Sequence, residues 1–239
     1  MSEEFVRFSK KQRIEHLIVM LLFILLAVTG FPQKFYEARW SAAVVNAIGG
    51  LDRVRFLHRI AGLLFSVAAV FHVMAVAVLA LMRRTGMTMV PTRRDFTDAI
   101  QQVGWYLGLA KESAKFDRFD YRQKFEYWGM LIGSLVMVVT GLILYLPLLF
   151  TRYFPGELVP VARVAHSNEG LLAFLVVIIW HIYNAHLSPD VFPFDTSIFT
   201  GRISRERMRH EHPLELARLT QEPSDALDAP GPPSGGAAP

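Results

Sequence analysis

Histidine placement is the feature of this chain that could support chemistry. Six of the eight histidines lie in or at the edges of long apolar segments, where an isolated imidazole is costly and needs a partner. Four form two matched pairs, His58 with His72 and His166 with His181. A spacing of fourteen or fifteen residues puts both rings near one helix face, roughly 21 to 23 Å apart in depth. Two such helices facing each other could clamp two stacked metal centres, so the pattern points to haem.

Composition narrows the metal chemistry and the class of protein. The chain has no cysteine, which excludes disulfides, thiolate metal sites, iron–sulfur ligation and covalent c-type haem attachment, and leaves histidine as the main metal ligand. A hydrophobic content of 52% over 239 residues, with mean hydropathy +0.31, favours a membrane protein. The net charge of +4 is not read as a nucleic-acid signal, because membrane proteins collect Lys and Arg on cytoplasmic loops.

Four apolar runs are long enough to cross the bilayer, each near or above the roughly 20 residues that a spanning helix needs. They lie near residues 16–33, 56–82, 127–150 and 164–187. The sequence therefore predicts an all-α, integral membrane four-helix bundle over residues 1–220. Residues 221–239 are rich in Pro, Gly, Ala and Ser, and are predicted to form a disordered tail.

Basic residues predict the orientation of these spans. Most loop Lys and Arg lie in the N-terminal flank and in the segment between the second and third spans. By the positive-inside rule, both termini and this long loop are cytoplasmic. We expect a multi-pass protein of the bacterial inner membrane whose first span is retained rather than cleaved as a signal peptide.

The long loop contains its own periodic segment. Phe96, Ile100, Val103, Leu107 and Ala110 recur at helical spacing with polar residues between them. This pattern predicts an amphipathic helix, which either lies on the bilayer surface or packs under the bundle.

Antiparallel spans convert sequence position into depth and bring two histidines together at the outer surface. His58 starts the second span and His166 starts the fourth, so both can bind one outer iron. Each is followed four residues later by glycine, Gly62 or Gly170, on the same helix face, where a flat macrocycle could lie against the backbone. Arg59 is placed either to meet a haem propionate or to snorkel at the interface.

The inner histidines allow more than one pairing. His72 and His181 lie toward the cytoplasmic half, His16 begins the first span and His186 ends the fourth. The helical angle from His58 to His72 and from His166 to His181 pairs His72 with His181 at an inner haem. Their depth in the membrane also allows His16 to pair with His181. If His72 takes His181, His16 and His186 are left as ligands for a third haem. Gly30 and Gly141, at outer depth on the first and third spans, are further candidate packing positions for haem.

At these residues the chain resembles the cytochrome b (gamma) subunit of membrane-bound respiratory formate dehydrogenases, and the wider group of dihaem b-type subunits. The resemblance covers nearly all four spans. It is carried by Arg13 to His16, Thr29-Gly30, Phe56-Leu57-His58 with Gly62, Gln123-Lys124 before Trp128, Val139-Thr140-Gly141, His166 with Gly170, His181-Ile182-Tyr183, and Gly201 to Ser204 ahead of His212-Pro213.

The resemblance implies two haems b, the outer held by His58 and His166 and the inner by His16 and His181. It also implies a quinone site beside the inner haem. The residues carried over to that site are Asp120, Arg122, Gln123, Tyr183 and Asn184. Asp120 and Arg122 stand where the formate dehydrogenase pattern has small or amide residues. His72 and His186 also depart from it, and look more like branches that serve multihaem c-type partners.

These patterns predict a subunit that passes electrons between a periplasmic redox partner and menaquinone or ubiquinone. The partner expected is an iron–sulfur protein or a multihaem cytochrome c, with membrane lipid as the surrounding solvent and no nucleic acid. The alternatives are a proton-coupled transporter and a non-redox membrane anchor, both using intramembrane histidines.

Overall fold

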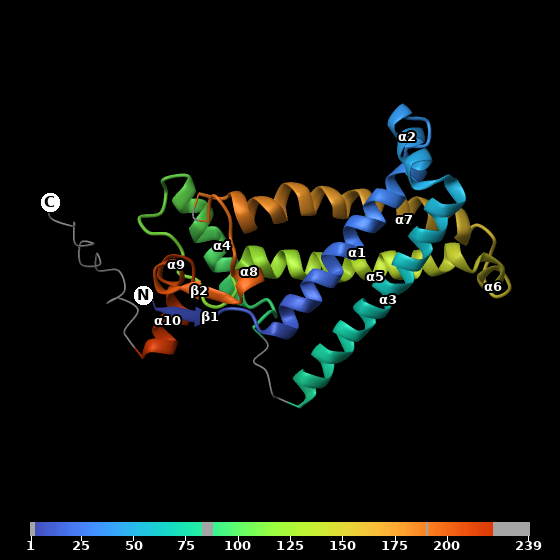
Figure 1. The fold of residues 1–239 in the computed structure, drawn as a ribbon. Coiled ribbons are helices and arrows are strands. Elements are labelled where there is room, and N and C mark those ends of the chain that lie inside the picture. The colour runs from blue at the N-terminus through green and yellow to red at the C-terminus, as the bar shows by residue number, and fades with distance from the viewer. Residues whose placement is uncertain (1–2, 83–87, 190, 222–239) are drawn as a thin grey trace. The chain divides into compact units, whose positions relative to one another are not determined.

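The computed structural model describes residues 3–82, 88–189 and 191–221, and these are mostly helical (Figure 1). Within them, four helices are long and apolar enough to cross a membrane. They are α1 (Lys10–Lys34), α3 (Leu51–Leu81), α5 (Tyr121–Tyr145) and a continuous helical run, Leu158–Leu187. The predicted all-α fold with four membrane spans is confirmed. The disordered tail predicted for residues 221–239 lies, apart from Gln221, outside the described residues.

The fourth span is not one regular α-helix. It begins as α7 (Leu158–Leu175) and continues as two wider π-helical segments, η1 (Val176–His181) and η2 (Tyr183–Leu187). A π-helical turn holds one more residue than an α-turn and occurs most often at functional sites. The widened part of this span carries His181.

Large apolar side chains point outward from the spans, as expected where lipid is the solvent. Val67 on α3 is 68% exposed and Leu135 on α5 is 64% exposed. In water such surfaces would favour aggregation, whereas hydrocarbon accepts them and the helix satisfies its own backbone groups.

The first two spans are joined by a short helix, α2 (Arg39–Ile48). Its Ser41 hydroxyl donates to the carbonyl of Pro32 in α1 at 2.6 Å. After α2 the chain turns at Gly49 and Gly50, which have φ values of 100° and 103° that favour glycine. This connection holds the end of α1 and the beginning of α3 together.

The remaining elements are short. Strands β1 (Glu4–Val6) and β2 (Arg202–Ser204) pair antiparallel, with Phe5 opposite Ile203. The other helices are α4 (Arg93–Tyr106), α6 (Pro147–Thr151), α8 (Ser197–Thr200), α9 (Arg205–Glu211) and α10 (Pro213–Thr220).

The chain divides into two compact units. The membrane unit comprises residues 9–87 and 126–195, and the polar unit comprises residues 1–8, 88–125 and 196–239, in each case as far as they are described. The single domain predicted over residues 1–220 stays a prediction.

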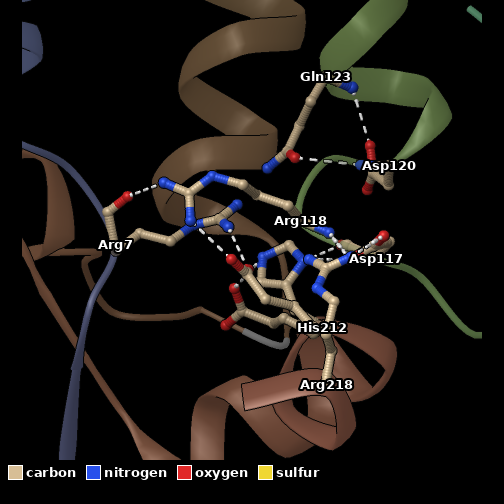
Figure 2. A network of polar contacts seen from close by, with 9 residues as sticks. Arg7, Asp117, Arg118, Asp120, Gln123, His212 and Arg218 are labelled. Carbon is tan, nitrogen blue, oxygen red and sulfur yellow. Dashed lines mark hydrogen bonds and ion pairs between the residues drawn. The ribbon is translucent and has the colours of Figure 1, made fainter. Parts of the chain in front are cut away.

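The polar unit is held by a small apolar core and a buried ion-pair network. Ile203, Met208 and Leu216 are almost fully buried. Beside them, Glu215 accepts from Arg7 at 3.0 Å and from Arg118 at 2.6 Å, while Arg118 also donates to the carbonyl of Arg7 at 2.6 Å. These contacts join three chain segments that are far apart in the sequence (Figure 2).

His212 belongs to the same network. Its Nδ1 bonds the carbonyl of Asp117 at 2.8 Å, and the Asp117 carboxylate accepts two hydrogen bonds from Arg218 at 2.9 Å (Figure 2). Burial lowers the pKa of His212 to about 3, and the charge of Arg7 acts in the same direction. His212 is therefore a neutral hydrogen-bond donor at physiological pH.

Candidate functional site

The outer pair of imidazoles faces across the membrane unit. The ring centres of His58 on α3 and His166 on α7 are 6.3 Å apart, with an interplanar angle of 83°. A metal–imidazole bond of about 2.0 Å, plus roughly 1.2 Å from that nitrogen to the ring centre, puts two axial rings about 6.4 Å apart across one metal ion. The observed spacing therefore fits one iron between these two rings.

Thr29 selects the ring nitrogen of His58 that is free to bind metal. The Thr29 hydroxyl lies 2.7 Å from the carbonyl of Leu25 and 2.9 Å from Nδ1 of His58. Because the hydroxyl donates its only hydrogen to the Leu25 carbonyl, it accepts the second hydrogen bond from Nδ1–H of the imidazole. The Nε2 lone pair of His58 then remains available as a ligand.

The same arrangement recurs at His166. The Thr140 hydroxyl lies 2.6 Å from the carbonyl of Val136 and 3.0 Å from Nδ1 of His166. Both outer imidazoles are thus held in the tautomer that can bind iron through Nε2.

Glycines next to these threonines make room for the rings. A Cβ at Gly30 would lie 3.1 Å from Cε1 of His58, and one at Gly141 would lie 3.2 Å from Cε1 of His166. Gly30 and Gly141 therefore accommodate the imidazoles themselves. Cβ atoms at Gly62 and Gly170 would be only in ordinary van der Waals range, with Leu26 at 4.0 Å and Met137 at 3.5 Å.

Basic groups lie near the outer pair. The Arg59 guanidinium is 5.9 Å from the ring centre of Tyr145, and its predicted role at a haem propionate stays a prediction. Lys34, which the sequence did not single out, donates to Asn168 at 2.8 Å and to Ser167 at 3.3 Å. These are the two residues that follow His166, so a second cation lies at this level.

The inner pair consists of His16 on α1 and His181 on η1. Their ring centres are 6.2 Å apart, at an interplanar angle of 35°, which is again the spacing that fits one iron between two imidazoles. Nδ1 of His181 forms a short hydrogen bond with the carboxylate of Glu126. A carboxylate accepts this proton and leaves Nε2 free, as in other carboxylate–histidine–metal arrangements.

His72 has both ring nitrogens engaged within the protein. Nδ1 lies 2.6 Å from Glu15 Oε1, and Nε2 lies 3.0 Å from the hydroxyl of Tyr127. Of the two inner pairings that the sequence left open, the structure brings His181 together with His16 and places His72 against Tyr127.

His186 occupies a third environment at the end of the fourth span. Its ring stacks on Phe194 at 4.1 Å, and Nδ1 accepts a hydrogen bond from the backbone N–H of Asp195 at 3.3 Å. A neutral ring that accepts at Nδ1 carries its proton on Nε2, so neither nitrogen offers a lone pair to iron. The third haem predicted for His16 and His186 stays a prediction, with His16 facing His181 instead.

These contacts show an internal repeat that relates the first helical pair to the second. The contact residues on α1 and α3 have counterparts on α5 and the fourth span, each at almost the same spacing. Glu15, His16, Thr29, Gly30, His58, Gly62 and His72 correspond to Glu126, Tyr127, Thr140, Gly141, His166, Gly170 and His181.

The π-helical segment explains the one difference in spacing. His72 follows His58 by fourteen residues, whereas His181 follows His166 by fifteen. The wider turn of η1 accommodates the extra residue. His181 therefore faces in the same direction relative to His166 as His72 does relative to His58.

The repeat also explains the position of His72. The counterpart of His16 is Tyr127, so the repeat produces two equivalent contacts at inner depth. One joins His16 and His181, and the other joins Tyr127 and His72 with ring centres 5.9 Å apart. His72 has the sequence spacing of an inner ligand because it occupies the position equivalent to His181. The residue that faces it is Tyr127 instead of a histidine.

The predicted quinone residues fall into the two separate units. In the polar unit, the buried Asp120 carboxylate accepts from Arg122 at 2.9 and 2.7 Å. Gln123 accepts from the Asp120 backbone N–H at 3.2 Å (Figure 2). In the membrane unit, Tyr183 is half exposed and Asn184 donates to the Trp180 carbonyl at 2.8 Å. The quinone site stays a prediction.

Comparison with known proteins identifies the family. Residues 7–190 match the family described as prokaryotic cytochrome b561. The chain is 24% identical to the cytochrome b556(Fdn) subunit of the nitrate-inducible formate dehydrogenase of Escherichia coli strain K12, with 95% of this chain and 99% of that subunit covered. It is 26% identical to the formate dehydrogenase cytochrome b556(fdo) subunit of the same strain, over 92% and 97% of the two chains.

A third relative is shorter in its match. The formate dehydrogenase cytochrome b556 subunit of Haemophilus influenzae is 23% identical, over 75% of this chain and 70% of that subunit. The family resemblance predicted from the histidine and glycine motifs is confirmed by these matches. This chain is thus a membrane-spanning b-type cytochrome that belongs to the prokaryotic cytochrome b561 family.

Proposed function

We propose that this chain is the haem-bearing membrane subunit of a respiratory oxidoreductase complex. In this role it passes electrons between a periplasmic redox partner and the quinone pool of the bacterial inner membrane. When bound, the haems supply one-electron redox chemistry, and the protein supplies ligation, spacing and exclusion of water. Quinone reduction takes up two electrons and two protons, which we assign to the cytoplasmic side.

The observation that carries this proposal is the pair of imidazole contacts at two depths. His58 with His166, and His16 with His181, have ring centres 6.3 and 6.2 Å apart. Hydrogen bonds from Nδ1 leave Nε2 free on His58, His166 and His181. We assign the first pair to an outer haem b and the second to an inner haem b.

Glu126 has a further role in this proposal. Its carboxylate holds His181 at Nδ1, so it orients the inner ligand and increases the basicity of the imidazole. We assign the quinone to the same end of the bundle, near Tyr183 and Asn184, because the fourth span ends there.

The names of the relatives indicate the kind of complex. All three relatives named above are formate dehydrogenase subunits, and two of them match over almost their whole length. We infer a periplasmic partner that delivers or receives electrons at the His58/His166 level, an iron–sulfur protein in a formate dehydrogenase or a multihaem cytochrome c in a related complex.

Haem counting in ligand variants tests the proposal. We expect the purified chain to give two haems b by pyridine haemochrome, and His58→Leu and His16→Leu each to lose one. The matched controls His72→Leu and His186→Leu should keep both low-spin signals. A colourless chain would leave the transporter or the non-redox anchor as the function. Loss of a haem in His72→Leu, with both retained in His16→Leu, would overturn the inner assignment.

A further inference from the structure

Helix α4 in the polar unit turns its polar side toward its own chain and its apolar side outward. The Gln102 side chain is buried and accepts from the backbone N–H of Ala114 at 3.1 Å. Gln101 donates to the carbonyl of Ser113 at 3.3 Å. The hydrogen-bonding face of this helix is therefore occupied by the loop that follows it.

The opposite face carries a continuous exposed apolar stripe. Its residues follow one another by three or four positions and thus share one side of the helix. They are Phe96 at 70% exposed, Ile100 at 75%, Val103 at 51% and Leu107 at 67%. A helix in water has the reverse arrangement, so this face requires an apolar partner.

Contacts within the polar unit join α4 to the start of a helix that is long and apolar enough to cross a membrane. Asp95 on α4 binds Lys124 at 2.7 and 2.9 Å, and Lys124 lies in the first turn of the membrane-spanning helix α5. The helix that carries the stripe is thereby joined to the first turn of a candidate membrane span.

The residues beside the stripe match the chemistry of a lipid headgroup region. Trp105 and Tyr106 end the helix and are 44% and 60% exposed, as is usual for side chains that prefer the membrane interface. Arg93 begins the helix, and Lys111 and Lys115 follow it in the sequence, so cations lie at both ends of the segment that carries the apolar face, and they favour anionic headgroups.

We propose that α4 lies in the plane of the membrane with its Phe96, Ile100, Val103 and Leu107 side chains inserted among lipid acyl chains. The occupant of this face is the bilayer. The inserted helix anchors the first turn of α5 through the Asp95–Lys124 ion pair. This inference is independent of the haem and quinone assignments.

The absence of native cysteine allows a direct test. A nitroxide is attached to Ile100→Cys or Phe96→Cys in the full haem-loaded chain, reconstituted in phosphatidylethanolamine–phosphatidylglycerol vesicles. Collision with oxygen, which concentrates in lipid, is compared with collision with a water-soluble nickel chelate. The matched control is Gln101→Cys, which lies about 100° around the helix from Ile100.

We expect an oxygen-to-nickel collision ratio at Ile100 and Phe96 several-fold above that at Gln101. A ratio at Ile100 equal to that at Gln101, with high nickel access, would show that the stripe faces water and would overturn the proposal. Low access to both reagents at Ile100 and Phe96 would also overturn it, because a protein surface, such as a second copy of this chain, would then cover the stripe. Circular dichroism spectra that match the native chain confirm that the fold is retained in the labelled variants.

Discussion

At the scale of single residues, two threonines determine how the outer ligands are presented. The hydroxyls of Thr29 and Thr140 each donate to their own helix and accept from Nδ1 of a histidine on a neighbouring span. Neither His58 nor His166 can then rotate or change tautomer without losing a hydrogen bond. The hydroxyl therefore reduces the reorganisation that metal binding would require.

We predict that Thr29→Val weakens haem retention at the outer site. Valine has nearly the same shape but cannot accept the proton of His58 Nδ1, and loss of such a partner typically costs about 10- to 100-fold in metal affinity. Haem content of the purified chain after competition with apo-myoglobin measures this effect. Thr29→Ser keeps the hydroxyl and should behave as the native chain. Equal haem retention in Thr29→Val and the native chain would contradict the prediction.

At the scale of elements, the π-helical segment η1 keeps the two halves of the repeat in register. Its extra residue lets His181 face His16 although its spacing from His166 is one residue longer than that from His58 to His72. In a regular α-helix the extra residue would rotate the ring by about 100° away from its partner.

We predict that deletion of Ile178 within η1 is tolerated by the inner site. The shortened segment can close to a regular α-helix, since its spacing then equals that between His58 and His72. The optical and EPR signals of both haems should be retained. Deletion of Leu22 from α1, which has no π-helical turn to absorb it, should rotate His16 and remove the inner haem. Equal loss of the inner signal in both deletions would refute this role for η1.

The packing of α10 in the polar unit predicts a pH dependence. His212 has a pKa near 6.5 when unfolded and about 3 when folded. Between these two pKa values only the unfolded state binds the proton. The free energy of unfolding therefore falls as the pH drops below ~6.5, by at most about 1.4 kcal/mol per pH unit. Above pH ~6.5 the contribution of His212 to stability is fully present.

The rate of proteolysis in the α9–α10 segment, measured above and below pH ~6.5, checks this expectation. We expect cleavage to accelerate at the lower pH in the native chain, and less so in His212→Gln, which keeps a hydrogen-bond donor but does not titrate. The same acceleration in both proteins would assign the effect to other groups.

At the scale of the whole molecule, the four spans and the positive-inside rule predict which surfaces face which compartment. Tyr36, in the connection after α1, is 70% exposed and is predicted to be periplasmic, whereas Leu109, after α4, is 80% exposed and is predicted to be cytoplasmic.

Single-cysteine labelling measures this orientation in intact cells. We expect Tyr36→Cys to react with a membrane-impermeant maleimide from outside, and Leu109→Cys to react only after the inner membrane is permeabilised. Because the chain has no cysteine of its own, neither signal has a protein background. The reverse pattern would invert the bundle and move the His58/His166 level to the cytoplasmic side.

The spans follow from the sequence alone, because about 20 consecutive apolar residues are sufficient to specify a membrane helix. The sequence also predicts that His58 and His166 lie at the same depth, because each begins a span that starts from the same side of the membrane. The glycines Gly62 and Gly170 were visible as a repeated spacing. The threonines that hold these histidines, Thr29 and Thr140, appeared in the sequence only as members of a family motif.

The pairing of the inner imidazoles, in contrast, follows from contacts between helices that the sequence does not specify. Depth and helix angle allow both His16 and His72 to face His181, since both lie at the same level of the bilayer. The choice depends on how α1, α3 and α5 are rotated about their own axes, and this is set by contacts between helices. Glu15 and Tyr127 occupy both nitrogens of His72, while the π-helical turn directs His181 toward His16.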